Sequence, residues 1–264
     1  MLRTLVERAT RSSVFRRRLP SALGGARFFV SASAGLGYLF RPVERIDPAL
    51  CALAREFVHT DYVVWDVGAN VGLFSFAAAH LAGPNGRVCS IEPDLWLVQL
   101  LRRSASQQPS TSAPVQVVPS AVAGACTLRT LNIATRSRAT NCLSGYGSTQ
   151  MGGVAEQQTV VTVTLDWLAE FLPPPDLVKI DVEGAELEVL RGAVNLLSSN
   201  RPIFLCEVCS ENFVPLTSLF RECGYRVFDG EEPAEQRQEL DVARWSTIAI
   251  PNSSTPPADS ATEA

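Results

Sequence analysis

Short apolar runs alternate with helical segments along most of the chain, and this alternation constrains the fold more than any other feature. "YVVWDVG" (62–68), "GRVCSIEP" (86–93) and "DLVKIDVEG" (176–184) have the pattern of buried strands. A segment with helical periodicity follows each of them. Strands that alternate with helices favour a mainly parallel sheet with helices on both faces. We therefore expect an α/β fold.

The signals that start and stop helices fit this alternation. Asp47 and Pro48 supply an N-cap acid and a first-turn proline. Gly83 and Pro84 close the helix expected in "NVGLFSFAAAHLAG". "VQVVPSAVAG" (115–124) is expected to be a third strand, and "AELEVLRGAVNLLSS" a helix after the fourth. The rhythm breaks at 125–165, where two extra strands flank a polar loop rich in glycine and serine.

The length and composition indicate one large domain with small additions. A chain of 264 residues with 46% hydrophobic and 19% charged residues is an ordinary globular protein with a sizeable core. We expect a basic N-terminal extension at 1–45, the catalytic domain at 46–250 and a disordered tail at 251–264. Seven cysteines with irregular spacing favour a reducing compartment, and we expect a cytoplasmic protein.

Charge is unevenly distributed. Residues 1–45 hold nine arginines and two glutamates, a net charge of +7, which leaves −11 for the rest of a chain whose total is −4. Nucleic acid is not expected as a partner of this acidic body. "RTLVERATRSSVFRRRL" (3–19) has the pattern of a basic amphipathic helix. Three alternatives remain open for the extension, which are packing on the body, peripheral attachment to an anionic membrane, and an organelle transit segment.

Acidic and glycine-rich features fall where the strands end. "DVGANVG" places Asp66 at the end of the first strand, with Gly68, Asn70 and Gly72 behind it at a spacing of two. Ligands of an open parallel sheet bind at such strand ends. A dinucleotide fingerprint requires G-x-G-x-x-G, whereas Asn70 replaces the middle glycine and Asp66 brings a negative charge. The turn therefore favours a ligand with a cationic amino group.

Glu92 ends the second strand, about 20 residues after the glycine turn, where a carboxylate binds both hydroxyls of a ribose. Alone, Glu92 is equally well explained as an acid at a helix N-terminus. Together, the glycine turn and Glu92 indicate a ligand that contains both a ribose and a cationic amino acid. S-adenosylmethionine is such a ligand.

The sequence resembles the FkbM family of S-adenosylmethionine-dependent methyltransferases over roughly residues 60–250. The matching segments, in family order, are "WDVGANVGLFSFAAA", "IEPD", "TLDWL", "VKIDVEGAELEVLRGA" and "RPIFLCEV". The resemblance implies the class I methyltransferase form of the Rossmann-like fold, with a mainly parallel seven-stranded sheet and helices on both faces. It implies S-adenosylmethionine as the cofactor.

The resemblance also implies a role for individual residues. Those expected to line the methionine part of the cofactor are Asp66, Gly68, Asn70 and Gly72. Glu92 is expected to hold the ribose, Ser120 and Ala121 to flank the adenine, and Asn141 to lie near the acceptor. The segment before the first strand departs from relatives, which often have Gly-Asp where this chain reads "HTDYVV". Any role of residues 1–50 in the acceptor site is therefore left open.

Three acids are the predicted catalytic set. Asp181 ends the fourth strand next to the first, close to the transferable methyl group, and Glu207 ends the neighbouring strand. Such a pair can orient an acceptor, act as a base or hold Mg²⁺, although no metal ligand is assigned. Glu183 either faces the acceptor or steadies the following helix, and Glu186 is expected to steady that helix.

Other polar residues have simpler explanations. Lys179, the only lysine, shares strand parity with Asp181 and is expected to form an ion pair with a strand-end acid. His59 is a base candidate by position, whereas His80 lies where it complements a helix dipole. Strand alternation points the side chains of the C-x-x-C pair at 206–209 to opposite faces, which disfavours a metal or redox role.

Three functions follow from these features. The first is O-methylation of a hydroxyl on a small molecule, sugar or glycolipid. The second is a nicotinamide-dependent oxidoreductase on a similar sheet, which Asp66 and Asn70 disfavour. The third is a non-catalytic domain that binds a cofactor. The sequence predicts no oligomeric state.

Overall fold

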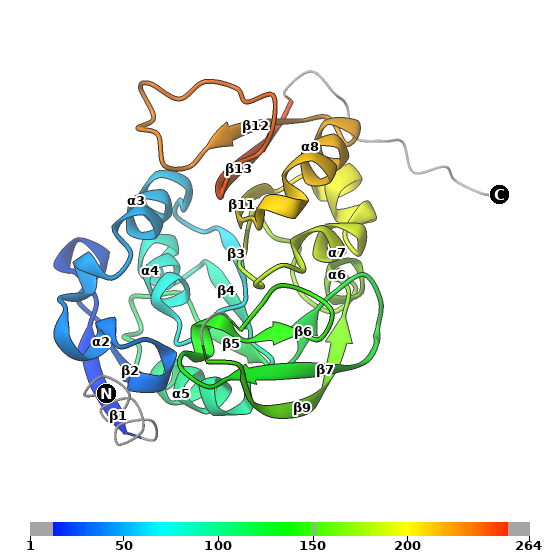
Figure 1. Ribbon diagram of the computed structural model, residues 1–264. Helices are drawn as coiled ribbons and strands as arrows, with labels where there is room; N and C mark the ends of the chain where they lie inside the picture. Colours follow the sequence, from blue (N-terminus) through cyan, green and yellow to red (C-terminus); the bar gives the residue numbers. More distant parts are fainter. Residues whose placement is uncertain (1–12, 150–151, 253–264) are drawn as a thin grey trace.

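A seven-stranded sheet forms the centre of the structure, in the order β12-β13-β11-β10-β3-β4-β5 (Figure 1). The computed structural model describes residues 13–149 and 152–252. The strands of the sheet are β3 (Val63–Val67), β4 (Arg87–Ile91), β5 (Val115–Val118), β10 (Leu177–Ile180), β11 (Ile203–Glu207), β12 (Tyr225–Asp229) and β13 (Ser246–Pro251).

The pairing confirms the expected parallel sheet. β10 pairs in parallel with both β3 and β11, and β4 pairs in parallel with β3 and β5. Only β13 runs antiparallel, between β11 and β12. The chain moves outward from β3 to β5 and then returns to β10 on the other side of β3. This reversal of strand order creates a crevice at the carboxyl ends of β3 and β10.

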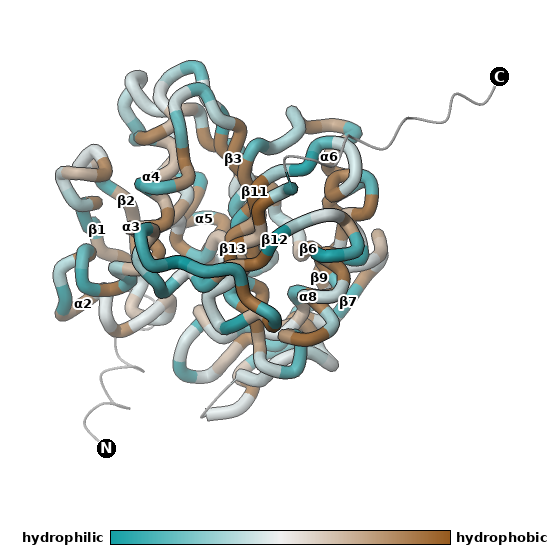
Figure 2. The backbone as a smooth tube through the Cα atoms, turned by 90° about the horizontal axis from the view of Figure 1, so that it is seen from above, coloured by the Kyte–Doolittle hydropathy of each residue, from teal (hydrophilic) through white to brown (hydrophobic). Residues whose placement is uncertain are grey.

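Helices cover both faces of the sheet, as expected. One face packs against α3 (Pro48–Phe57), α4 (Leu73–Ala82) and α5 (Leu95–Ala105). The other packs against α6 (Leu165–Ala169), α7 (Glu186–Arg191) and α8 (Phe213–Glu222). Successive side chains of β3 alternate between them, because Val64 joins the first core and Trp65 the second. Figure 2 shows the hydrophobic tube of β3, β11 and β13 running through the middle of the molecule.

Residues 121–163 form a separate small sheet beside the crevice. Its order is β6-β9-β7-β8, with β6 (Ala121–Val122), β7 (Thr127–Ala134), β8 (Cys142–Leu143) and β9 (Val154–Val163). The two extra strands expected in this region are therefore confirmed. The expectation of one continuous strand over 115–124 was wrong, because the chain leaves the central sheet after β5 and enters the second sheet at β6.

The N-terminal segment forms a hairpin rather than a helix. β1 (Val14–Arg18) pairs antiparallel with β2 (Arg27–Ser31), so the expected amphipathic helix is wrong for these residues, and residues 3–12 lie outside the described part. Burial of consecutive apolar residues on β2 explains the difference, since Phe28, Phe29 and Val30 all join the first core. The hairpin is joined to α5 by a hydrogen bond from the Phe29 N–H to Ser104 Oγ (2.8 Å). Residues 13–45 thus pack on the body.

The remaining elements are short. They are α2 (Gly37–Phe40), a π-helical turn η5 (Leu196–Asn200) and the 3-10 turns η1 (Ser21–Leu23), η2 (Ala32–Ala34), η3 (Val43–Arg45), η4 (Arg138–Thr140) and η6 (Ser210–Asn212). The helix expected over 185–199 is broken into α7 and η5, and Asp166 accepts the N–H groups of Asn195 and Leu196 at the break. Within the described ranges, every helix is too short or too polar to cross a bilayer.

Candidate active site

The turn between β3 and α4 needs residues that tolerate positive φ. Gly68, Asn70 and Gly72 have φ of 75°, 51° and 87°. These are the three positions that the sequence spaces by two, and asparagine is among the residues that adopt this conformation most readily. At Gly68 a Cβ atom would lie 1.8 Å from the carbonyl oxygen of Asp181. Only glycine therefore lets the β3 turn approach the end of β10.

Backbone hydrogen bonds fix this turn to β4. The N–H groups of Gly68 and Ala69 both donate to the Ile91 carbonyl, at 2.9 and 3.1 Å. The Asn70 N–H donates to Glu92 Oε2 (2.9 Å), and Glu92 Oε1 accepts the Asp94 N–H (2.9 Å). Burial raises the pKa of Glu92 to about 8, against the opposing effect of these backbone donors. The turn and Glu92 thus form one rigid wall.

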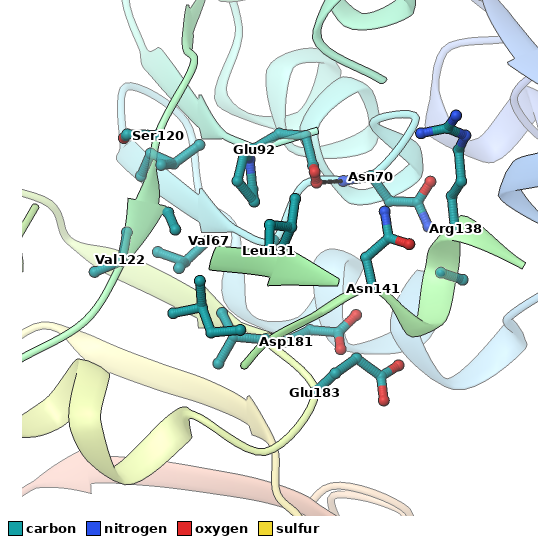
Figure 3. A pocket seen from close by; sticks show the side chains of 17 residues that line it. Val67, Asn70, Glu92, Ser120, Val122, Leu131, Arg138, Asn141, Asp181 and Glu183 are labelled. Atoms are coloured by element: carbon teal, nitrogen blue, oxygen red, sulfur yellow. Dashed lines mark hydrogen bonds between the residues drawn. The ribbon is translucent and has the colours of Figure 1, made fainter. Parts of the chain in front are cut away.

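A cavity opens above this wall at the carboxyl ends of β3, β4 and β10 (Figure 3). It holds about 580 Å³ of empty space including its mouth. The predicted residues that line it are Gly68, Asn70, Glu92, Ser120, Ala121, Asn141, Asp181 and Glu183. We call it the cofactor cavity.

Two oxygen atoms of this cavity have no hydrogen-bond partner within the protein, and the Nε of Arg138 has none either. Ser120 is only 5% exposed, and its Oγ is buried and unpaired. Asn70 Oδ1 is likewise buried without a partner. Buried polar atoms usually find a partner, because an unpaired one costs about 1–3 kcal/mol. These two atoms are therefore available to a ligand.

Asp66 and Gly72 lie outside the cavity lining. The Asp66 carboxylate is fully buried below the turn, where Oδ2 accepts from Ser75 Oγ (2.5 Å) and Oδ1 lies 3.3 Å from Lys179 Nζ. At Gly72 a Cβ atom would lie 2.5 Å from the Phe76 ring. Both residues therefore stabilise the turn from the side away from the cavity. Neither belongs to the lining in which it was expected.

Lys179 connects the buried acid to the site. Its Nζ donates to Asp181 Oδ2 (3.3 Å) and to the Gly68 carbonyl (3.1 Å), besides its ion pair with Asp66. Burial lowers the pKa of Lys179, but the charges of Asp181 and Asp66 outweigh this effect and raise it overall. The lysine therefore stays protonated, and the expected ion pair with a strand-end acid is confirmed.

A second cavity adjoins the cofactor cavity on the side of α3. Its polar lining includes Asp47, Lys179, Asp181, Glu183 and Glu207, and Gly35 and Tyr38 contribute from the N-terminal segment. Asp181, Glu183, Gly68 and Asn70 line both cavities. We call this second space the acceptor cavity. Asp181 and Glu207 meet there because Ile180 and Cys206, the residues before them, are paired in register.

The environment of two of these acids favours their protonated form. Burial, with a further contribution from the negative charge of Asp181, raises the pKa of Glu183 to about 8. The same two causes raise the pKa of Glu207 to about 8, with Lys179 acting in the opposite direction. Carboxyl groups with such values exchange protons near neutral pH, which suits general acid–base chemistry.

Glu186 and Gly184 hold the chain after Asp181. Glu186 is fully buried, and it accepts the Gly184 N–H (2.6 Å) and Asn212 Nδ2 (2.8 Å). Its expected role in steadying the start of α7 agrees with these contacts. At Gly184 a Cβ atom would lie 2.5 Å from the backbone nitrogen of Gly147. The glycine therefore lets the loop of the small sheet close against the end of β10.

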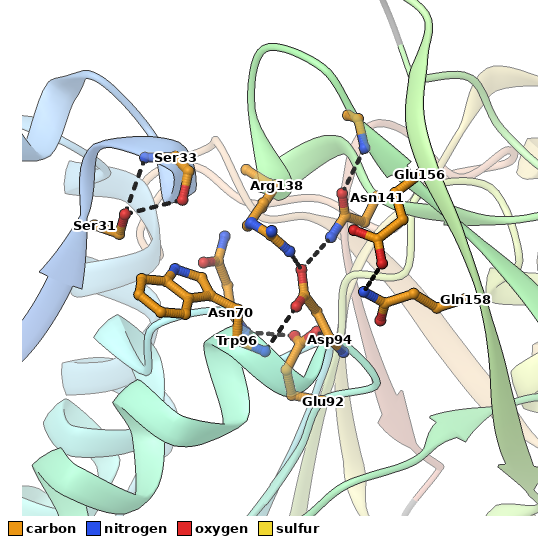
Figure 4. Close-up of polar contacts among 12 residues, drawn as sticks. Ser31, Ser33, Asn70, Glu92, Asp94, Trp96, Arg138, Asn141, Glu156 and Gln158 are labelled. Atoms are coloured by element: carbon orange, nitrogen blue, oxygen red, sulfur yellow. Dashed lines mark hydrogen bonds and ion pairs between the residues drawn. The ribbon is translucent and has the colours of Figure 1, made fainter. Parts of the chain in front are cut away.

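A polar clamp between α5 and the small sheet closes one end of the cofactor cavity (Figure 4). Asp94, the N-cap of α5, accepts from Arg138 Nη1 and from Asn141 Nδ2 (2.8 Å). Asn141 Oδ1 accepts the Ala134 N–H (2.9 Å). Asn141, expected near the acceptor, thus lines the cofactor cavity with both polar groups engaged. Sequence reasoning missed Arg138, whose loop carries no recognisable pattern.

Neither histidine reaches the site. His59 precedes β3 and so lies at the amino-terminal end of that strand, whereas the cavities lie at its carboxyl end. Its ring packs edge-on against Tyr62 (5.1 Å between centroids). The candidate role of His59 as the base is therefore wrong. His80 lies in the last turn of α4, away from the cavities, and its ring packs against the turn at Gly24. All seven cysteines are free, and no group of His, Cys, Asp or Glu within the described residues is arranged to hold a metal ion.

The fold and the site together define a Rossmann-like protein of the class I methyltransferase type, with the strand-end cavity of that class. The sequence profile of the methyltransferase FkbM domain matches residues 66–227. The chain belongs to the FkbM methyltransferase family.

Individual proteins are also similar to this chain. The chain is 32% identical over 149 residues to the hexuronic acid methyltransferase AglP of Haloferax volcanii, and the alignment spans 56% of each chain. A tRNA m1G37 methyltransferase of M. jannaschii is similar in structure, with a TM-score of 0.50 and 13% identity over 91% of this chain and 55% of that one. A methyltransferase FkbM of Methylobacillus flagellatus has a TM-score of 0.45 and 18% identity, covering 72% of this chain and 43% of that one.

Proposed function

We propose that this chain transfers a methyl group from S-adenosylmethionine to an oxygen of a sugar-like acceptor. One observation carries the proposal: two cavities meet at Asp181 and Glu183, and one of them has the polar groups of a nucleoside site. A donor bound in the first cavity and an acceptor bound in the second would react across these acids. Such positioning supplies much of the rate of a displacement reaction.

The cofactor cavity fits S-adenosylmethionine in its donor and acceptor groups. Glu92 would accept hydrogen bonds from the ribose hydroxyls, and the free Ser120 Oγ would bind the adenine edge beside Ala121. Asn70 Oδ1 would accept from the amino group of the methionine part, in the turn that Gly68 forms. Asp66 and Gly72 would act from behind this turn. When bound, the cofactor supplies an electrophilic methyl group on a sulfonium.

The acids of the acceptor cavity would handle the proton of the acceptor. Glu207 would take the hydroxyl proton of the acceptor, whose oxygen would receive the methyl group that the bound cofactor supplies from its sulfonium. The position of Glu207 in the acceptor cavity and its pKa of about 8 support this role. Asp181, held by Lys179 at 3.3 Å, would orient the acceptor. Glu183 would contribute to the same charge cluster.

A sugar acceptor is supported by the relative named as a hexuronic acid methyltransferase. A glycolipid or a small molecule with a hydroxyl would suit the same chemistry. Mg²⁺ bound by Asp181 and Glu207 would be an alternative to a carboxylate base, and the described residues do not supply a metal cluster for it. We propose residues 46–250 as the limits of the catalytic domain, with 1–45 as its basic extension and 251–264 as its tail. Within this tail, Pro251 still pairs in β13, and residues 253–264 lie outside the described part.

The N–H groups of the glycine turn argue against a nicotinamide dinucleotide. A pyrophosphate site needs free N–H groups at the turn and helix start. Here the N–H groups of Gly68, Ala69 and Asn70 are already bonded to Ile91 and Glu92, and that of Gly72 to the Ala69 carbonyl.

Calorimetric titration of the full chain with S-adenosylmethionine tests the proposal. We expect binding with a Kd in the micromolar range, ~8 kcal/mol of binding free energy, and none with NAD. The absence of S-adenosylmethionine binding by the folded chain would overturn the proposal. Asp181→Ala distinguishes an enzyme from a non-catalytic domain, because methyl transfer should be lost while the cofactor still binds.

A further inference from the structure

A third hollow continues the acceptor cavity toward β13. It holds about 580 Å³ of empty space including its mouth, and it shares Asp47, Leu50, Lys179 and Glu207 with the acceptor cavity. Its outer lining is formed by Glu231, Trp245 and Ser246. We call it the outer cleft. A ligand longer than one ring in the acceptor cavity would therefore extend into it.

The outer cleft exposes a large aromatic side chain beside carboxylates. Trp245 is 49% exposed, although it lies on a well-fixed part of the chain, because its carbonyl accepts the N–H of Val208 (2.8 Å). Val208 directly follows Glu207, so one backbone hydrogen bond joins the chain at Trp245 to the chain just after the proposed base. Tryptophan presents a rigid apolar face with little loss of side-chain entropy on binding, and it is common where ligands are bound.

The charges of the outer cleft disfavour an anionic ligand. Three acids line it, Asp47, Glu231 and Glu207, the last with a pKa raised to about 8, and Lys179 is the only cation in its lining. The Nζ of Lys179 is already held by Asp66, Asp181 and the Gly68 carbonyl. Among the described residues of this lining, no uncommitted cation is therefore present to balance a carboxylate, phosphate or sulfate on a ligand, and the acids disfavour a ligand of like charge.

An aromatic face flanked by hydrogen-bond acceptors matches the chemistry of an uncharged sugar ring. The C–H groups of one ring face form an apolar patch that would bury against the indole of Trp245. The hydroxyl groups at the ring edge can donate hydrogen bonds to the carboxyl oxygens of Glu231 and Glu207. A ring that carries its own carboxylate would place it among these acids.

We propose that the outer cleft binds an uncharged sugar unit next to the one that is methylated. This inference rests on the proposed function, because it concerns the acceptor of the same reaction. The acceptor is then a glycan or glycoside of at least two units. The unit in the outer cleft stacks on Trp245, and the neighbouring unit presents its hydroxyl to Glu207.

A comparison of matched oligosaccharides tests this proposal. The full chain would be screened against pairs with the same linkage that differ only at C6, such as galactotriose and trigalacturonic acid, in a panel of several linkages. We expect the original chain to bind the neutral oligosaccharides. Trp245→Ala should bind them at least about tenfold more weakly, the loss expected when a buried aromatic contact is removed. Trp167→Ala is the matched control, because Trp167 is also exposed (41%) but lies on α6 away from the cleft.

Each outcome of the screen decides the proposal. Preferential binding of the uronic acids, unchanged affinity of Trp245→Ala, or the absence of any binder in the panel would overturn it. Glu231→Gln provides a second measurement, because it should weaken neutral binders and lessen the discrimination against uronic acids. S-adenosylmethionine affinity, measured in parallel, separates a failure of the outer cleft from a failure of the proposed function, since none of these residues lines the cofactor cavity.

Discussion

Lys179 and Asp66 lie side by side in register on β10 and β3, with Lys179 Nζ 3.3 Å from Asp66 Oδ1. Both side chains are almost fully buried. From this pair the polar contacts continue to Ser75 and Ser90 on one side and to Asp181 on the other. The only lysine of the chain thus links the floor of the glycine turn to the acid at the centre of the site.

Removal of the lysine should leave a buried charge unpaired. We expect Lys179→Met to lower the free energy of unfolding by about 3–5 kcal/mol, as breaking a buried ion pair does. The double variant with Asp66→Asn should recover part of this loss, because the uncompensated carboxylate is removed. Urea unfolding measures both. Equal stability of Lys179→Met and the original chain would show that the pair is not structurally important.

Neutralisation of the central acid should affect turnover far more than cofactor binding. For Asp181→Asn we expect methyl transfer to fall ~100-fold or more, the size of the loss that misplacement of a reactant causes. Its shape is kept, so the affinity for S-adenosylmethionine should change little. Glu188→Gln is a suitable control, because Glu188 pairs with Arg191 on the surface of α7. A similar loss in the control would attribute the effect to general destabilisation.

The raised pKa of Glu207 predicts a pH profile. A carboxyl group must be deprotonated to accept the hydroxyl proton, so kcat/KM should rise with pH and level off above about 8. Glu207→Gln removes the base, and the remaining activity should be low and lose this rise. Measurement of initial rates from pH 6 to 9 checks both statements. A flat profile in the original chain would assign the proton to another acceptor.

Glu92 should decide cofactor affinity. Its two oxygens hold the Asn70 and Asp94 N–H groups, and its carboxyl group lines the cavity at the proposed ribose position. Glu92→Ala should weaken S-adenosylmethionine binding at least about tenfold, equal to 1.4 kcal/mol. Ser120→Ala should have a smaller effect, because it removes one hydrogen bond of about 1 kcal/mol. Calorimetry on both variants provides the comparison, and the reverse order of effects would relocate the ribose.

The basic N-terminal extension predicts salt-dependent attachment to anionic membranes. Arg16, Arg18 and Arg27 are exposed on the β1–β2 hairpin. Arginines near an anionic surface contribute roughly 1 kcal/mol each, and salt screens this attraction. The chain should sediment with phosphatidylserine vesicles in low salt and be released in high salt. Replacement of these three arginines by glutamine should abolish sedimentation. Vesicles of neutral lipid are the control, and equal binding to them would contradict an electrostatic mechanism.

The sequence by itself determined the sheet and the ends of its strands. Val64 and Trp65 differ in face because successive strand residues point in opposite directions. The turn at Gly68 and Asn70 was recognisable because few residues tolerate positive φ. The ion pair of Lys179 with a strand-end acid followed from strand parity. These are local properties, and local residues encode them directly.

Only the tertiary structure decided which of these features meet. The prediction of His59 as a base candidate was wrong, because His59 precedes β3 and lies at the amino-terminal end of that strand, whereas the site lies at its carboxyl end. Asp66 supports the turn from below, and Arg138 joins the site through Asp94, although 44 residues separate them. The outer cleft combines Trp245 with Asp47 from distant parts of the chain. Such contacts depend on how elements pack, and no short-range pattern records the partner across the fold.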